Sequence, residues 1–544
     1  CWISADGGAI NFIMKTNGKG NPHFVKNDDR IYLNGRGTLS SVRWDGTDAK
    51  DVVTVTGRMS HGGTRAPSAS FMRMAPEGDK VLAQVGIDLF VVTVPKLGQK
   101  PTISVSDPSS SQFPSWQLTE IGGQFPTWSG NAKKAHWSIG NAHFIYDLDE
   151  AKVYSDSVTV AKKEKEKLEK AKSKEEKEKE KADKEATEKD LTDEEKAEAK
   201  KKEEDPGYQP LEFRVEMTAV KDIPEGTALL KGARIITMNG DLVIENGDIL
   251  IENARIKAVG PSGSLDVPRR TEVIDMSGKT IIPGMIDTHA HMWPSWGIQK
   301  NQVWVYAANL AYGVTATRDP QTATTDVLTY SDMVETGDIV GPRVYSTGPG
   351  IFSGNNFKSL EHTRNVLKQY SEYYNTKTIK MYLAGNRKHR QWIIQASKEQ
   401  ELMPTTEGGL DFKFNMANLI DGYPGQEHSF PIHPLYKDVI KTVADAKMAY
   451  TPTLLVSYGG PWAENYYYSR ENPYGDPKLN HFTPYNELAP KSRRRPGWFM
   501  DEEHVFQKHA EGVNSIVEAG GLAGVGSHGQ LQGLGFHWEL WSMA

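Results

Sequence analysis

Short apolar stretches separated by turn residues recur along the first part of the chain, up to about residue 158. In each instance a turn containing Asp or Gly precedes a short apolar strand, and a second turn leads to another strand, as in 74–92 and 128–146. Strand–turn units that recur every ~40 to 55 residues favour the blades of a β-propeller. Some other all-β domain is the alternative interpretation.

A strongly charged segment, residues 161–205, interrupts this pattern. It consists almost entirely of Lys, Glu, Asp and Ala, and its only large apolar side chains are Leu168 and Leu191. Glu and Lys at i,i+4 spacing, such as Glu175 with Lys179, stabilise an isolated helix. Because the segment has no apolar stripe to bury, it predicts a solvated surface helix or helical hairpin, with a docking arm as the alternative.

Strand alternation resumes directly after the charged segment, at 211–217. We therefore interpret the segment as an insertion within the last blade, and residues 1–227 as a partial, all-β propeller. Turns such as Trp128-Ser129-Gly130-Asn131 approach a Trp-Ser-x-Asp-Gly pattern. With such turns, this part of the chain resembles the TolB-like (WD40-like) propeller.

The pattern changes near residue 228. Residues 228–282 contain short strands with turn residues between them, which predicts a small composite β unit of the sandwich type. From residue 283 to 544, strand-like and helix-like segments alternate, which favours βα repeats around a parallel sheet. Residues 461–501, rich in Tyr, Pro, Asn and Arg, are expected to form a long loop after the seventh strand that shapes a substrate pocket.

Eight strands, the number in a TIM barrel, are expected in this last part. They are placed at 285–289, 313–318, 343–347, 378–382, 401–406, 425–428, 449–455 and 522–527. The sequence thus predicts a multidomain protein: a partial propeller, a small β-sandwich unit and an α/β TIM barrel over 283–544.

Composition limits the classes of function. The chain has 544 residues with 64 basic and 70 acidic side chains, a net charge of −6, which gives no reason to expect nucleic acid or another polyanion as a partner. No apolar stretch approaches the ~20 residues of a membrane span, and no signal peptide heads the sequence. A single cysteine excludes internal disulfides and thiolate-clustered zinc, which leaves His, carboxylates or a modified Lys as metal ligands.

Two histidines follow the first expected strand of the barrel. The apolar run from Pro283 ends in Asp287-Thr288-His289-Ala290-His291. On a strand, side chains alternate faces with period two, so His289 and His291 are expected to point the same way and to share one metal ion. A chance pairing on a polar face is the alternative.

Further polar side chains occupy the ends of later strands, where a TIM barrel places its active site. Lys380 lies in the fourth strand, Glu407 follows the fifth, His428 ends the sixth and His528 ends the eighth. Lys380 has the alternative role of a salt-bridged barrel lysine, and Glu407 that of a carboxylate at a helix N-terminus. Some other polar residues in or near strand-end loops receive no role: Arg318, Asp319, His433, His537 and Glu539.

The run Gly278-Lys279-x-x-x-Pro283-Gly284-Met285-Ile286-Asp287-Thr288-His289-x-His291, the small β unit before it and the strand-end residues after it resemble the amidohydrolase superfamily. The resemblance is to its imidazolonepropionase/prolidase-like branch, fused behind a TolB-like propeller. It implies that His289 and His291 hold a first metal, that Lys380 is carboxylated and bridges two metals, and that His428 belongs to the second metal.

Two positions depart from that family. The superfamily usually has His after strand five, where this chain has Glu407, which leaves the number of metals at one or two. The strand-eight Asp, which usually ligates the first metal and shuttles a proton, is replaced by His528. A histidine with an ordinary pKa of ~6.5 is able to do either job, so His528 is expected to be the catalytic proton carrier.

The resemblance implies a metal-dependent hydrolase that uses metal-activated hydroxide on a carbon–nitrogen bond other than an ordinary peptide bond. A divalent ion, zinc above all, lowers the pKa of bound water to ~7 and polarises a carbonyl. The expected substrate is a small amide, a cyclic amide or a dipeptide-like molecule. The rival class is a propeller-based scaffold with a degenerate barrel site. A serine exopeptidase is disfavoured, because the chain has no Gly-x-Ser-x-Gly elbow.

Three expectations concern the chain as a whole. It begins at Cys1 without an initiator Met and ends soon after the eighth strand, so it is expected to be a piece of a longer protein, truncated before the last barrel helix. Analogy with TolB-like fusions implies a periplasmic or otherwise exported protein. The sequence leaves a homo-oligomer open.

Overall fold

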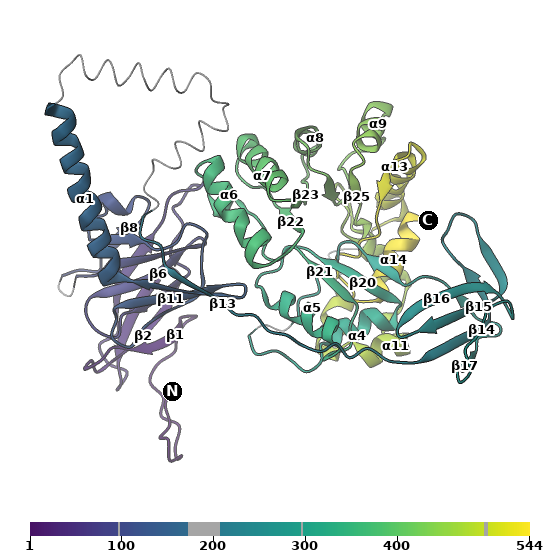
Figure 1. Cartoon of the computed structure of the whole chain (residues 1–544), viewed down its shortest axis with the longest axis horizontal. Coiled ribbons are helices and arrows are strands. Elements are labelled where there is room, and N and C mark those ends of the chain that lie inside the picture. Colours follow the sequence, from purple (N-terminus) through teal and green to yellow (C-terminus); the bar gives the residue numbers. More distant parts are fainter. Residues whose placement is uncertain (96–97, 172–206, 295–296, 494–498) are drawn as a thin grey trace. The chain divides into compact units, whose positions relative to one another are not determined.

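The computed structural model describes residues 1–95, 98–171, 207–294, 297–493 and 499–544 (Figure 1). The chain divides into two compact units, Cys1–Glu216 and Met217–Ala544. The division thus falls before the boundary expected at residue 227. Within the described ranges, none of the helices combines the length and the apolar character that crossing a membrane requires.

The described residues of unit 1 form three β-sheets. The first has the strand order β1-β2-β3-β4-β8, antiparallel except for β4 with β8. The second has the order β5-β6-β7-β9 and the third β10-β11-β12-β13, both antiparallel. The strands are β1 Gly20–Phe24, β2 Arg30–Gly35, β3 Thr38–Arg43, β4 Lys50–Thr56, β5 Phe71–Met74, β6 Lys80–Val85, β7 Asp88–Thr93, β8 Thr102–Ser104, β9 Ser115–Gln117, β10 Gln124–Trp128, β11 Lys134–Ile139, β12 Ala142–Asp147 and β13 Leu211–Arg214.

Apolar side chains at alternate positions of these strands form the core of unit 1. Leu39, Val53, Val81 and Val92 are fully buried and belong to one cluster shared by the first two sheets. Repeated sheets of four or five strands agree with the strand–turn pattern of the sequence. Closure into a propeller stays a prediction.

Helix α1, Leu148–Ala171, follows β12 directly and includes the first residues of the charged segment. These residues are helical and exposed as far as Lys167, as a solvated helix requires. The rest of the segment, 172–205, lies outside the described residues. Strand β13 pairs with β12, so the charged segment is inserted between two neighbouring strands of one sheet.

Unit 2 begins with the small β unit. Its sheet has the order β16-β15-β14-β17, and β18 also pairs with β14. Ala233, Ile235 and Ile249 form its buried centre. The strands are β14 Thr227–Ile236, β15 Val243–Glu252, β16 Arg255–Pro261, β17 Glu272–Asp275 and β18 Thr280–Ile281.

Among the described residues, eight parallel strands follow, in two sheets with the orders β19-β20-β21 and β22-β23-β24-β25-β26. Backbone hydrogen bonds join Ile351 to the end of β22, and others join His289 and His291 to His528 beyond β26. All eight strands coincide with expected positions, whereas a single closed barrel stays a prediction. The strands are β19 Met285–Asp287, β20 Val314–Asp319, β21 Arg343–Ser346, β22 Thr378–Met381, β23 Met403–Thr406, β24 Gly425–Glu427, β25 Ala449–Thr451 and β26 Leu522–Ala523.

Helices alternate with these strands (Figure 1). Their starts carry local signals: Ser359, Asn386 and Asp411 each accept hydrogen bonds from backbone N–H groups of the first turn. Helix α8 ends at Gly422, whose φ of 105° suits glycine. The helices are α4 Trp304–Ala311, α5 Asp326–Thr336, α6 Leu360–Lys368, α7 Arg387–Glu399, α8 Phe412–Asp421, α9 Lys437–Asp445, α13 Phe506–Glu518 and α14 Leu534–Met543.

The structure corrects two expectations about the C-terminal part. Residues 461–501 are not a long loop, because they contain α10 Ala463–Arg470, α11 Pro477–Phe482 and α12 Tyr485–Ser492. Apolar side chains of these helices are buried in a cluster with α14: Tyr467, Tyr468, Leu479, Leu488 and Trp538. Strand β26 is also followed by a helix, α14, which buries one face in the same cluster, whereas no helix was expected after strand eight.

Candidate metal centre

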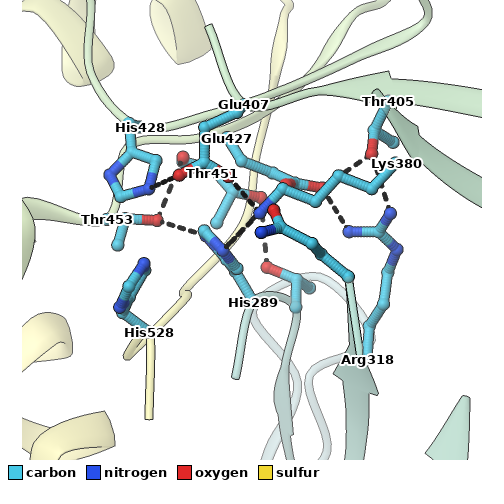
Figure 2. Close-up of polar contacts among 12 residues, drawn as sticks. His289, Arg318, Lys380, Thr405, Glu407, Glu427, His428, Thr451, Thr453 and His528 are labelled. Atoms are coloured by element: carbon cyan, nitrogen blue, oxygen red, sulfur yellow. Dashed lines mark hydrogen bonds and ion pairs between the residues drawn. The ribbon is translucent and has the colours of Figure 1, made fainter. Parts of the chain in front are cut away.

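The predicted site residues meet at the C-terminal ends of the parallel strands (Figure 2). Each follows or ends a different strand, except that His289 and His291 both follow β19. The structure brings together His289, His291, Lys380, Glu407, His428 and His528. All of them are buried, except that His528 is partly exposed. Residues more than 200 positions apart therefore form one cluster.

Lys380 lies at the middle of this cluster with no exposed surface. Its Nζ lies 2.8 Å from Glu427 Oε2 and 3.2 Å from His289 Nε2, and it also contacts Glu407 Oε2. Burial lowers the pKa of Lys380, but the two carboxylates outweigh burial and raise it above its ordinary value. As an unmodified lysine the side chain is therefore an ammonium that pairs with two carboxylates, and its carboxylation stays a prediction.

The two carboxylates stay ionised although they are buried. Burial raises the pKa of Glu407, but Lys380 and His428 outweigh it and hold that pKa well below its ordinary value. Glu427 behaves similarly: Lys380 and Arg318 lower its pKa more than burial raises it. Arg318 contacts Glu427 Oε1 through Nη1 and donates from Nη2 to Thr405 Oγ1 at 2.8 Å.

Glu427 and Arg318 are functional candidates that the sequence interpretation missed. Period-two alternation places Glu427 and His428 on opposite faces of a strand, which argues against both reaching one site. His428, however, lies just beyond β24 with φ at +72°, so its side chain turns to the same side as Glu427. The only sequence signal was the adjacency of two polar residues at a strand end.

His428 meets Glu407 in an arrangement that requires a cation or a proton. Its Nδ1 lies 3.1 Å from the carbonyl oxygen of Val456, which only accepts, so Nδ1 carries hydrogen. In the neutral ring, Nε2 is then a lone pair, and it lies 2.9 Å from Glu407 Oε1. Two acceptors at this distance repel each other unless positive charge lies between them.

Several buried polar atoms at the centre make no hydrogen bond of acceptable geometry within the described ranges. They are His428 Nε2, Glu407 Oε2 and Glu427 Oε2, of which the two carboxylate oxygens are ion-paired with Lys380 Nζ. Buried polar atoms in folded proteins usually have partners, and an ion is one explanation where they do not. Ligand atoms lie within 4.8 Å of one another in two groups of three: His289, His428 and His528, and His289, Glu407 and Glu427.

Three of the imidazoles, those of His289, His291 and His528, are held neutral. Burial, followed by the charge of Lys380, lowers the pKa of His289 well below its ordinary value and that of His291 to about 3. Burial, followed by the neighbouring His291, lowers the pKa of His528 as well. Neutral imidazole is the form that binds metals.

The two histidines of the pair differ in their surroundings, and a metal ion shared by both stays a prediction. The ring centroids of His289 and His291 lie 5.2 Å apart, and His289 belongs to both three-ligand groups. Among the described residues, neither group includes His291, whose ring packs 4.7 Å from that of His528. His289 is thus the central ligand candidate, and His291 is a neighbour of His528.

Three residues at the ends of the last strands have left-handed backbone. His428 has φ at +72°, His528 at +60° and Thr453 at +49°. Such conformations are uncommon outside glycine, and for a β-branched Thr they are strained. Backbone hydrogen bonds hold two of them, from His428 N to Thr451 O at 2.8 Å and from His528 N to His289 O at 2.6 Å. Strain of this kind gathers at functional sites.

Two buried acids support the cluster from outside. Asp287 accepts hydrogen bonds from Ser527 Oγ at 2.5 Å and from the backbone N of His289 at 3.1 Å, and burial raises its pKa to about 6. Asp319 lies beside the small pocket next to His291, and burial raises its pKa to about 8. Aromatic rings cover the outer side of two imidazoles: Trp293 stacks on His291 and Tyr458 on His428.

The remaining polar residues near strand ends lie in other surroundings. His433 Nε2 lies 3.6 Å from Glu511, and His537 Nε2 donates to the carbonyl of Tyr312 at 2.9 Å. Glu539 is fully buried and contacts the turn after strand seven.

No family model and no curated protein matches this chain. Among solved structures, it is similar to a Xaa-Pro dipeptidase with bound methionine, with 14% identity over 59% of this chain and 84% of that chain and a TM-score of 0.42. A putative prolidase from Bifidobacterium longum has 18% identity over 57% and 77%, with a TM-score of 0.41. The ochratoxinase of A. niger has 15% identity over 58% and 80%, with a TM-score of 0.41. These neighbours are amidohydrolase- or prolidase-like. Because the identities and TM-scores are low, an inference about activity has to rest on the geometry of the site.

Proposed function

We propose that this protein is a metal-dependent hydrolase that cleaves a carbon–nitrogen bond of a small amide, a cyclic amide or a dipeptide-like molecule. The observation that carries the proposal is the contact of His428 Nε2 with Glu407 Oε1 at 2.9 Å, beside the buried Oε2 atoms of Glu407 and Glu427, which face Lys380 Nζ. A divalent cation at this point would satisfy these atoms together.

The donor set fits a divalent ion such as zinc. Neutral imidazole nitrogen and carboxylate oxygen are its preferred ligands where thiolates are absent. The residues that would hold one or two ions are His289, Glu407, Glu427 and His428. A bound ion of this kind supplies an activated water at neutral pH and polarises the scissile carbonyl.

The charges of the neighbouring side chains bear on whether the Lys380 amine is carboxylated. Lys380 and Arg318 balance Glu407 and Glu427 in the described structure. Carboxylation of the Lys380 amine would replace one positive charge with a negative one, and the centre would then have a net negative charge that a divalent cation balances. We therefore propose that metal loading and carboxylation of Lys380 occur together.

His528 is suited to move a proton. Its Nδ1 lies 3.3 Å from Gln530 Nε2, and an amide nitrogen only donates, so the ring hydrogen lies on Nε2 in the neutral form. His528 is also partly exposed, unlike the other histidines of the site. The neutral ring would take up the proton that the attacking water loses and would then pass a proton to the departing nitrogen, while Trp293 and Tyr458 flank the imidazoles with flat apolar faces for the substrate.

One observation favours the second candidate, a propeller-based scaffold whose barrel site has lost its metal. The Lys380 ammonium already pairs with both carboxylates, so it acts there as an internal cation. Under this alternative, Lys380 stays uncarboxylated and the protein binds no metal.

The test is metal content and hydrolysis by the full chain. Purified protein, supplied with zinc and bicarbonate, is analysed for bound metal and assayed on N-acyl amino acids, dipeptides and cyclic amides. We expect one to two equivalents of zinc, loss of this zinc in His428→Ala, and retention in His433→Ala, a histidine outside the cluster. A folded protein without bound metal would refute the enzyme and leave the scaffold.

A further inference from the structure

The turn after the seventh strand is held by a buried glutamate side chain. Thr453 has left-handed backbone, φ +49° and ψ 58°, and leads into the 3₁₀ turn η4, Leu454–Val456. Glu539 of α14 accepts hydrogen bonds from the backbone N–H groups of Leu454 at 2.7 Å and Leu455 at 2.9 Å. Both carboxyl oxygens of a fully buried side chain are thus used to hold this one turn.

The first residue of the turn contacts His289. Thr453 Oγ1 lies 2.9 Å from His289 Nδ1, and the same hydroxyl donates to the carbonyl oxygen of Thr451 at 3.4 Å (Figure 2). Since the hydroxyl has a single hydrogen, it accepts from His289 Nδ1–H. The Nε2 lone pair of His289 therefore faces the centre, 3.2 Å from Lys380 Nζ.

The last residue of the turn contacts His428. The carbonyl oxygen of Val456 accepts from His428 Nδ1–H at 3.1 Å, so Nε2 of this ring also faces the centre. A single four-residue turn therefore fixes the hydrogen position of two histidines that come from different strands. Val456 is part of the turn whose start Glu539 holds.

We infer that the turn 453–456, held in place by Glu539, is the positioning device that presents Nε2 of both His289 and His428 to the metal centre. The inference rests on the proposed function, because the direction of these lone pairs matters only if a cation binds there. It assigns roles to Thr453 and Glu539, neither of which was assigned a role from the sequence. Outer partners that fix the tautomer of a metal-binding histidine typically change metal affinity by about 10- to 100-fold.

The physical reason for a buried carboxyl group at this point is the strained turn. A β-branched residue in the left-handed region does not hold its conformation unless its surroundings enforce it. Packing of Leu454 and Leu455 against Trp538 contributes, since all three belong to one cluster. Packing does not select the direction of the N–H groups, whereas the two oxygens of Glu539 do.

The experiment measures zinc affinity of the full chain by competition with a chelator, together with the absorption spectrum of bound cobalt(II), which reports the geometry of its ligands. We expect Thr453→Val to bind zinc about 10- to 100-fold more weakly and to change the cobalt spectrum. Thr453→Ser restores the hydroxyl and is expected to restore both. Glu539→Gln, which sets an amide group against one N–H, is expected to weaken binding in the same way.

Thr451→Val is the matched control. Thr451 is buried at the end of the same strand, and its hydroxyl contacts Thr288 Oγ1 at 3.2 Å instead of a histidine. We expect it to keep native zinc affinity. If the native chain binds zinc and Thr453→Val binds it equally well, the positioning role is overturned and the proposed function stands. If the native chain binds neither metal, the proposed function fails and the positioning role fails with it.

Discussion

The candidate site has two sides, and they avoid the energetic cost of buried charge in different ways. The carboxylate side consists of Lys380, Glu407, Glu427 and Arg318, and here every charge faces an opposite charge. The imidazole side consists of His289, His291 and His528, and here burial and the nearby Lys380 keep the rings neutral.

This contrast shows two ways in which buried side chains keep the protonation state that metal binding requires. Ionised groups in a low-dielectric interior need partners, because an unpaired buried charge is strongly unfavourable. Titratable imidazoles have a second solution, which is to lose their proton. The carboxylate side is therefore sensitive to the removal of a charge, and the imidazole side is sensitive to pH.

The largest effect is expected from Lys380→Met, which breaks the carboxylate side. Removal of this ammonium leaves two buried carboxylates without the cation that they share, and loss of one partner of a buried pair destabilises a protein by about 3–5 kcal/mol. The measurement is the free energy of unfolding of unit 2 in urea at pH 7, without metal.

Lys221→Met is the control for this variant. Lys221 pairs with Glu335 at 3.0 Å, with both side chains about half exposed, so its loss is expected to change the free energy of unfolding by less than about 1 kcal/mol. Equal effects of the two variants would mean that the buried ion pairs give unit 2 no particular stability.

A smaller effect on the free energy of unfolding is expected from pH. Its pH range differs between the imidazole side and the carboxylate side. The pKa of His291 is about 3 in the folded protein and ~6.5 when unfolded, so the unfolded state binds the extra proton between these values. The stability that His291 contributes is complete above pH ~6.5 and is lost as the pH falls toward 3. The loss reaches at most about 1.4 kcal/mol per pH unit. The lowered pKa values of Glu407 and Glu427 affect stability only below pH ~4.5.

The measurement compares the native chain with His291→Asn between pH 4.5 and 6.5. We expect the free energy of unfolding of the native chain to fall more steeply on acidification than that of the variant. Asp319 and Glu539, whose pKa burial raises to about 8, contribute the opposite slope in this range, but they are present in both proteins and cancel in the difference. Parallel curves would contradict a neutral, buried His291.

The smallest effect is expected from Arg318→Lys, which keeps the charge of the carboxylate side but not its geometry. An ammonium does not reproduce the guanidinium contacts with both Glu427 and Thr405, so about 1 kcal/mol of the free energy of unfolding is expected to be lost. Arg318→Met, which also removes the charge, is the comparison variant. If both variants destabilise equally, charge has no part in the role of Arg318.

Much of the arrangement follows from local sequence patterns. The eight strands of unit 2 lie at the expected positions because short apolar runs and flanking turn residues specify strands locally. The helices in 461–501 were missed, because their apolar positions are sparse. These positions become buried only by packing in the same cluster as Trp538. Propensity alone does not report such distant partners.

The sequence by itself determined that His289, Lys380, Glu407, His428 and His528 stand at strand ends, since chain order and period-two alternation suffice for that. The tertiary structure alone decided that Lys380 lies between two carboxylates, that Glu427 joins them, and which nitrogen of each histidine faces the centre. These features depend on left-handed turns and on contacts between residues more than 80 positions apart, such as those of Glu539 with the turn at 454–455. Their physical cause is burial. Only the folded chain excludes water from these groups, and a buried charge or lone pair is unfavourable without a partner.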